Sequence, residues 1–163
     1  PYQSLIKSVV FQQLRPSSAV AIFNRFTQYF DSNFPTAKQI LDTPKNNLKK
    51  CGLSTNKLST IIDIASQVEN EGLENRKGFE VMSDIQIIQK LIKIKGIGEW
   101  TAQMLMIFNL GRLDIFPVSD FALKKNYSLF KNISSPINVK DLSKISEEWK
   151  PFRSIAAWYL WQY

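Results

Sequence analysis

Histidine is absent from this chain of 163 residues, and cysteine occurs once, at Cys51. Without histidine there is no Ser-His or Cys-His nucleophile pair, and the most common ligand of zinc is missing. A single thiol excludes an internal disulfide, and it also excludes a zinc or iron–sulfur site built from several thiolates. Any chemistry must therefore use carboxylates, hydroxyls, lysines and backbone groups.

Long apolar runs are absent as well, since none approaches the roughly 20 residues that a membrane-spanning helix needs. Acidic residues are the minority among the charges: 21 lysines and arginines against 14 aspartates and glutamates give a net charge of +7. This excess favours a polyanionic partner, nucleic acid before an anionic membrane. A chain of this length fits one domain and can bury a real core.

Helical periodicity recurs along the chain, and strand alternation does not. Pro16 is placed to start one helix, and Ser54, Ser83 and Asn138 are placed to cap three others. Residues 73–80 (LENRKGFE) look like a polar connection. The pattern predicts an all-α fold with about ten short helices.

The segment IKGIGEWTAQMLMIFNLGRLDIFPVSD (residues 94–120) carries two glycines one residue apart and ends on a single carboxylate, Asp120. A helix, a tight turn and a second helix form a hairpin, in which glycines allow a positive φ and a close approach of another surface. The turn can present N–H groups beside the positive end of the next helix, and a DNA phosphate suits such a site. An αα-corner closed by Gly96 and Gly98 is the alternative, while Lys95 adds a cation at the tip.

The stretches IKGIGEWTAQMLMIF and DIFPVSD together resemble the helix-hairpin-helix (HhH-GPD) DNA glycosylase superfamily. SLIKSVVFQQL, CGLSTNKLSTIIDIA and WKPFRSIAAWYLW are similar to three further blocks of its bacterial 3-methyladenine DNA glycosylase II branch, in the same order. The resemblance implies a single domain over residues 1–163 with the two-lobed glycosylase fold. The central lobe would comprise residues 32–115, and the other lobe residues 1–31 with 116–163.

By this resemblance Asp120 is the catalytic residue, although an aspartate before a helix is also a preferred N-cap, and the two roles are compatible. A carboxylate fixed in a dry pocket stabilises the positive charge that develops on deoxyribose as the base departs. Family members that also cut the strand carry a nucleophilic lysine two residues past the second hairpin glycine, where this chain has Trp100. The resemblance therefore implies an N-glycosylase without AP lyase activity.

A base inside a duplex must be flipped out to reach Asp120. The resemblance places Trp100 and Trp161 in the wall of the receiving pocket, and Trp158 is a further candidate one helical turn before Trp161. Electron-rich aromatic faces attract the cationic ring of an alkylated purine. Met104 stands where the best-studied branch commonly has an aromatic residue, which indicates a reshaped pocket. A core role remains the alternative for each tryptophan.

The resemblance also assigns contacts with DNA. Leu14 is expected to enter the base stack as a wedge, and a core position at a helix end is the alternative. The DNA-contacting residues expected in and after the hairpin are Lys95, Gly96, Ile97, Gly98 and Thr101. Hairpins of this superfamily often hold a structural sodium or potassium ion on main-chain carbonyls, and the matching carbonyls here are those of Ile92, Ile94 and Ile97.

The sequence thus predicts a monomeric, monofunctional DNA glycosylase that needs no cofactor for catalysis. It would bind double-stranded DNA and hydrolyse alkylated bases, 3-methyladenine and related cationic purines, from it in base excision repair. We expect it in the cytoplasm, on the nucleoid. One alternative is the same fold acting on deaminated or mismatched bases. Others are a non-catalytic helix-hairpin-helix module and a basic protein-interaction domain, the latter without strong salt dependence of DNA affinity.

Overall fold

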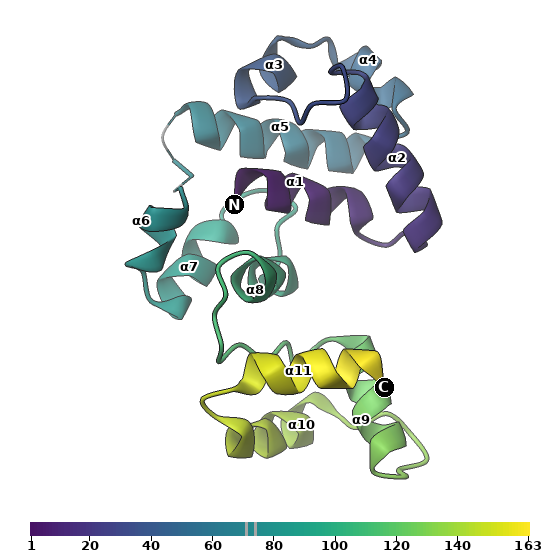
Figure 1. The fold of residues 1–163 in the computed structure, drawn as a ribbon, viewed down its shortest axis with the longest axis vertical. Helices are drawn as coiled ribbons and strands as arrows, with labels where there is room; N and C mark the ends of the chain where they lie inside the picture. The colour runs from purple at the N-terminus through teal and green to yellow at the C-terminus, as the bar shows by residue number, and fades with distance from the viewer. Residues whose placement is uncertain (71, 74) are drawn as a thin grey trace. The chain divides into compact units, whose positions relative to one another are not determined.

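The computed structural model describes residues 1–70, 72–73 and 75–163, and within these it contains only helices, eleven α-helices and one 3₁₀-helix, joined by turns and loops (Figure 1). The all-α prediction is therefore confirmed. The first seven helices are α1 (Tyr2–Phe11), α2 (Pro16–Gln28), α3 (Ala37–Asp42), α4 (Lys45–Lys50), α5 (Thr55–Glu69), α6 (Arg76–Glu80) and α7 (Asp84–Leu91). The rest are α8 (Glu99–Phe108), α9 (Phe121–Phe130), α10 (Val139–Ser146), η1 (Glu147–Trp149) and α11 (Arg153–Gln162).

Side-chain caps begin three helices where the sequence predicted them. Ser54, Ser83 and Asn138 each accept a hydrogen bond from the backbone N–H three residues later. Pro16 is the first residue of α2, where its missing N–H costs nothing because the first turn has no intrahelical acceptor for it. These starts were readable because each depends on one local residue.

The prediction of a polar connection over residues 73–80 is wrong for its second half, which forms α6. Asn75 caps this short helix by accepting the N–H of Gly78, and Phe79 is fully buried. One apolar anchor and one cap therefore outweigh the polar composition of the segment. Residue 74 of that range lies outside the described residues.

The chain forms two compact units, residues 1–105 (unit 1) and residues 106–163 (unit 2). In unit 1 the long helix α5 is the central element: α1, α3 and α4 pack against it, and α2 packs against α1 (Figure 1). The fully buried side chains Leu5, Val9, Ile61 and Ile64 belong to the resulting core. The lobes predicted from the sequence, 32–115 and 1–31 with 116–163, stay a prediction.

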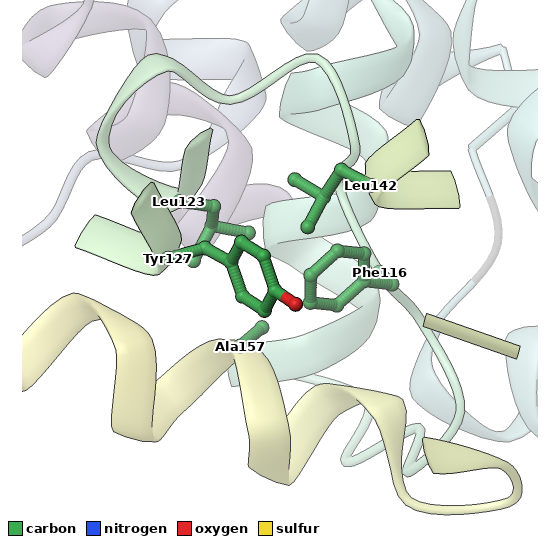
Figure 2. Close-up of a cluster of buried hydrophobic side chains, with 5 residues drawn as sticks. All are labelled: Phe116, Leu123, Tyr127, Leu142 and Ala157. Atoms are coloured by element: carbon green, nitrogen blue, oxygen red, sulfur yellow. The ribbon is translucent and has the colours of Figure 1, made fainter. Parts of the chain in front are cut away.

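Unit 2 has its own core, in which side chains from α9, α10 and α11 meet the segment before α9. Figure 2 shows Phe116, Leu123, Tyr127, Leu142 and Ala157 directed toward one another. Since α9 packs against α11, the residue that begins α9 is held close to the last turns of α11. Across the described residues, no helix has the length and apolar character of a membrane span.

Candidate active site

Asp120 is the N-cap of α9, as one of the two readings of the sequence predicted. Its Oδ1 accepts the backbone N–H of Leu123 at 2.9 Å, and its own N–H donates to the carbonyl of Pro117 at 2.8 Å. The carboxylate is half-buried and lies at the positive end of a ten-residue helix. Both the cap and the helix dipole hold an anionic oxygen pair in one orientation.

Trp161 contacts the same carboxylate from α11. Its indole Nε1–H donates to Oδ1 of Asp120 at 3.3 Å, so that this oxygen accepts from two donors. The indole also packs against the core of unit 2, and its ring centroid lies 5.6 Å from that of Phe108. The sequence placed Trp161 in a pocket wall, but the hydrogen bond that joins two residues 41 positions apart has no signature in the sequence.

The loop that leads toward Asp120 is fixed by polar contacts of Arg153 with Asp114 and of Ser154 with Arg112 and Ile115, and this set of contacts is the polar clip. The Arg153 guanidinium makes a two-pronged ion pair with Asp114, with Nε–Oδ1 at 2.7 Å and Nη2–Oδ2 at 2.9 Å. The pKa of the Asp114 carboxyl is held below its usual range, and the main cause is hydrogen bonding from the Arg153 side chain. The buried Ser154 hydroxyl donates to the carbonyl of Arg112 at 2.7 Å and accepts the N–H of Ile115 at 2.9 Å.

Sequence reasoning missed the clip, although the block WKPFRSIAAWYLW contains two of its residues. Arg153 and Ser154 begin α11, and their partners lie 39 to 42 positions earlier in the chain. The clip therefore joins the start of α11 to the loop between α8 and α9. It fixes the N-terminal end of the helix whose last turns carry Trp161.

An open apolar groove of about 450 Å³ lies in unit 2 beside α11. Its lining residues are Ile107, Phe108, Gly111, Arg112, Leu113, Ser154, Ile155, Trp158 and Tyr159. Trp158, a predicted pocket residue, lines this groove and is 47% exposed, whereas Trp161 packs against the core of unit 2 and contacts Phe108, another lining residue. That both tryptophans of α11 line the pocket for a flipped base stays a prediction.

The other predicted pocket residues, Trp100 and Met104, lie on α8 within unit 1. Trp100 is 39% exposed and Met104 is 9% exposed. The Trp100 indole is therefore partly open to solvent next to the hairpin, while Met104 is largely packed. That these two side chains share a pocket with Asp120 stays a prediction.

The hairpin before α8 needs glycine at position 96. Gly96 has φ +85°, and a Cβ there would lie 2.1 Å from the Thr60 hydroxyl oxygen on α5. Gly98 differs, because it does not have a positive φ and an added Cβ would meet no atom within 4 Å. The first glycine therefore serves the turn and its packing on α5, and the second leaves a surface that another molecule can approach closely.

Two of the N–H groups of the turn are already engaged: that of Ile97 donates to the carbonyl of Ile94 at 3.0 Å, and that of Lys95 donates to Oδ2 of Asp63 at 2.9 Å. In the described part of the chain, no group accepts the N–H of Gly96 or Gly98. These two donors lie beside the N-terminus of α8, so the turn can bind an anionic oxygen without a charged side chain.

The remaining predicted contacts are in different settings. Leu14 lies in the turn between α1 and α2 and is 37% exposed, which suits a wedge better than a core residue. Thr101 is 3% exposed, and its hydroxyl oxygen accepts a hydrogen bond from Gln12 Nε2 at 3.0 Å. Its predicted contact with DNA is untested, and the geometry favours a role inside unit 1. Among the three carbonyls predicted to hold a cation, that of Ile94 retains one lone pair beside its bond to Ile97.

Comparison with known proteins gives a consistent result. Residues 6–152 match the family described as "HhH-GPD superfamily base excision DNA repair protein". The chain is 39% identical to an alkylbase DNA glycosidase-like protein of Schizosaccharomyces pombe, over 99% of this chain and 77% of the relative. It is 36% identical to DNA-3-methyladenine glycosylase 1 of the same organism, over 99% of this chain and 72% of the relative.

Solved structures agree with the sequences. The 3-methyladenine DNA glycosylase of Schizosaccharomyces pombe in complex with abasic DNA superposes with a TM-score of 0.93 at 36% identity, over 99% of this chain and 79% of that one. A DNA-3-methyladenine glycosidase of Bacillus halodurans superposes with a TM-score of 0.89 at 33% identity, covering 99% and 74%.

Proposed function

This chain belongs to the HhH-GPD superfamily of base excision DNA repair proteins, and from that premise we propose that it is a monofunctional DNA glycosylase. It hydrolyses the N-glycosidic bond of alkylated bases, chiefly 3-methyladenine and related cationic purines, in double-stranded DNA. Relatives with 36–39% identity along nearly the whole chain carry names with this substrate class, which supports the proposal. The observation on which it rests is the carboxylate of Asp120, held at a helix N-terminus by two N–H donors.

In the proposed reaction, Asp120 acts on the sugar. As the alkylated base leaves, positive charge develops on C1′ and the ring oxygen of deoxyribose, and a fixed carboxylate stabilises that charge without having to reorient. The Leu123 N–H and the Trp161 indole both donate to Oδ1, and because the carboxylate is planar, these two hydrogen bonds also restrict the position of Oδ2. Water then adds to the sugar, and the products are a free base and an abasic site.

Strand cleavage does not follow in this proposal. A lyase needs a lysine that attacks the sugar to form a Schiff base, and the position at which the family carries that lysine holds Trp100. The indole has no nucleophilic nitrogen, and its exposed face instead suits stacking on a cationic purine.

The hairpin is the proposed phosphate contact. The N–H groups of Gly96 and Gly98, with Lys95 at the tip, bind the strand without reading its sequence. The proposal includes a sodium or potassium ion on the carbonyls of Ile92, Ile94 and Ile97, which would link the hairpin to a phosphate. The net charge of +7 supports DNA as the partner. We place the protein, as a monomer, on the nucleoid.

The test is release of 3-methyladenine from methylated duplex DNA under single-turnover conditions, with wild type beside Asp120→Asn. Asparagine is an equally good N-cap and keeps an oxygen for both donors, so this variant is expected to fold. A panel of oligonucleotides with one defined lesion each, alkylated, deaminated or mismatched, separates the proposed substrates from the alternative ones. A chain that binds duplex DNA but releases no base from any of them is the non-catalytic module.

A further inference from the structure

The loop that carries Leu14 has an unusual backbone. It spans residues 12–15, between α1 and α2, and its second residue, Gln13, has φ +53° without being a glycine. A left-handed conformation at a residue with a Cβ is unfavourable, and it persists only when the surroundings fix it. The groups that fix this loop are therefore relevant to how Leu14 is presented.

Two side-chain hydrogen bonds lie at the start of this loop. Lys57 on α5 donates from Nζ to the carbonyl of Val10 at 2.7 Å, which satisfies an acceptor in the last turn of α1. Gln12 Nε2 donates to the Thr101 hydroxyl at 3.0 Å. Thr101 is buried in the first turn of α8, three residues after Gly98, so the Gln12 side chain joins the loop directly to the helix that follows the hairpin.

Helix α5 holds the hairpin by its neighbouring residues. Asp63 accepts the N–H of Lys95, and Thr60 packs against Gly96 where no Cβ fits. Because Lys57, Thr60 and Asp63 are spaced by three residues, they lie along one side of α5. The last turn of α1, from which the Leu14 loop starts, and the hairpin are therefore both held by one helix, and Gln12 connects the loop to α8 after the hairpin.

We propose that Gln12 is a positioning residue for base extrusion: its hydrogen bond to Thr101 sets the position of Leu14 relative to the phosphate-binding hairpin. This inference rests on the proposed function, in which the hairpin grips the strand, and on the predicted role of Leu14 as the wedge that fills the gap left by the flipped base. A wedge works only if it enters the duplex at the step where the hairpin holds the backbone. A loop free to move would lose part of its binding energy to ordering on each encounter.

The test compares two substrates. One is a duplex with a single alkylated base paired normally. The other carries the same base unpaired, in a one-nucleotide bulge, where extrusion breaks no base pair and therefore depends little on a wedge. Gln12→Met keeps the length and apolar body of the side chain without its amide, and Thr101→Val keeps the shape of threonine without its hydroxyl. Thr101→Ser is the conservative variant that restores the hydroxyl.

On the paired substrate we expect Gln12→Met and Thr101→Val each to lower the single-turnover rate roughly fivefold to tenfold, the effect of one lost hydrogen bond, and the double variant to be no slower than either. On the bulged substrate the rates change by less than about twofold, since that hydrogen bond acts only on extrusion. Thr101→Ser recovers most of the rate on the paired substrate. In a Leu14→Ala background, Gln12→Met has no further effect.

Equal losses of single-turnover rate on both substrates would mean that Gln12 merely stabilises the fold. No loss of rate on either substrate would mean that the hydrogen bond does not contribute to base release. Either result overturns the inference, as does a Gln12→Met effect that persists without Leu14. The proposed function is judged separately. It fails if the wild-type protein releases no base from either substrate, and it stands if the wild-type protein releases the alkylated base, whatever the Gln12 and Thr101 variants do.

Discussion

Replacing Trp161 by phenylalanine removes one N–H donor from Asp120 and leaves an aromatic ring beside Phe108. A hydrogen bond to a charged acceptor contributes about 1.5–3 kcal/mol net. The Nε1–Oδ1 distance of 3.3 Å is longer than that of the Leu123 donor, 2.9 Å, so the lower end of this range applies. A loss of about 1.5 kcal/mol from the transition state corresponds to roughly a tenfold slower reaction.

The assay is single-turnover release of 3-methyladenine from methylated duplex DNA, with the unfolding free energy measured in parallel. Trp149→Phe is the matched control: Trp149 also packs on the core of unit 2, 5.3 Å from Phe116 between ring centroids. We expect both variants to lose comparable stability, and only Trp161→Phe to lose rate.

A double-mutant cycle isolates the contact. In the Asp120→Asn background the charged acceptor is gone, so adding Trp161→Phe is expected to have little further effect on the rate. The reasoning is refuted if Trp161→Phe releases base as fast as the wild-type protein, or if its effect is the same with and without the carboxylate of Asp120.

The remaining predictions concern the two hairpin glycines, the Asp114 carboxyl and strand cleavage. Gly96→Ala lowers the unfolding free energy by about 2–4 kcal/mol in urea denaturation because of its positive φ and the Thr60 contact. Gly98→Ala leaves that energy within about 0.5 kcal/mol of wild type but weakens duplex binding, and equal stabilities of the Gly96→Ala and Gly98→Ala variants would contradict this comparison. The depressed pKa of Asp114 gives stability that is present above the unfolded pKa of about 3.9 and lost as pH falls through the folded value, so the deficit of Asp114→Asn at pH 7 should vanish in acid. Borohydride should trap no covalent complex with DNA, and a trapped complex would show a lysine nucleophile.

Much of the fold was readable from local signals. Ser54, Ser83 and Asn138 begin their helices as predicted, because a cap is a matter of one side chain and the next turn. The segment 73–80 was misread because a single buried residue, Phe79, anchors α6 within an otherwise polar stretch. The average composition of a segment does not reveal that one of its residues is buried and anchors a helix.

The candidate site was predictable in its residues but not in its contacts. Asp120 could be read as a helix cap, and the resemblance to glycosylases identified it as catalytic. The hydrogen bond between Trp161 and Asp120 joins positions 41 residues apart, and the packing of α9 against α11 brings them together. The ion pair of Arg153 with Asp114 joins the start of α11 to the loop before α9, 39 positions earlier. Gln12 and Thr101 are 89 positions apart, and their contact likewise depends on tertiary packing rather than on a local signal.

Base release by Asp120→Asn is the most direct test of the central claim, that one oriented carboxylate stabilises the sugar while the alkylated base leaves. The variant should match the wild-type protein in unfolding free energy and in affinity for duplex DNA. Its single-turnover rate on methylated DNA is expected to fall by roughly a hundredfold or more, the usual effect of removing a preorganised electrostatic group. A rate within about twofold of wild type, in a protein that binds DNA normally, would contradict the account.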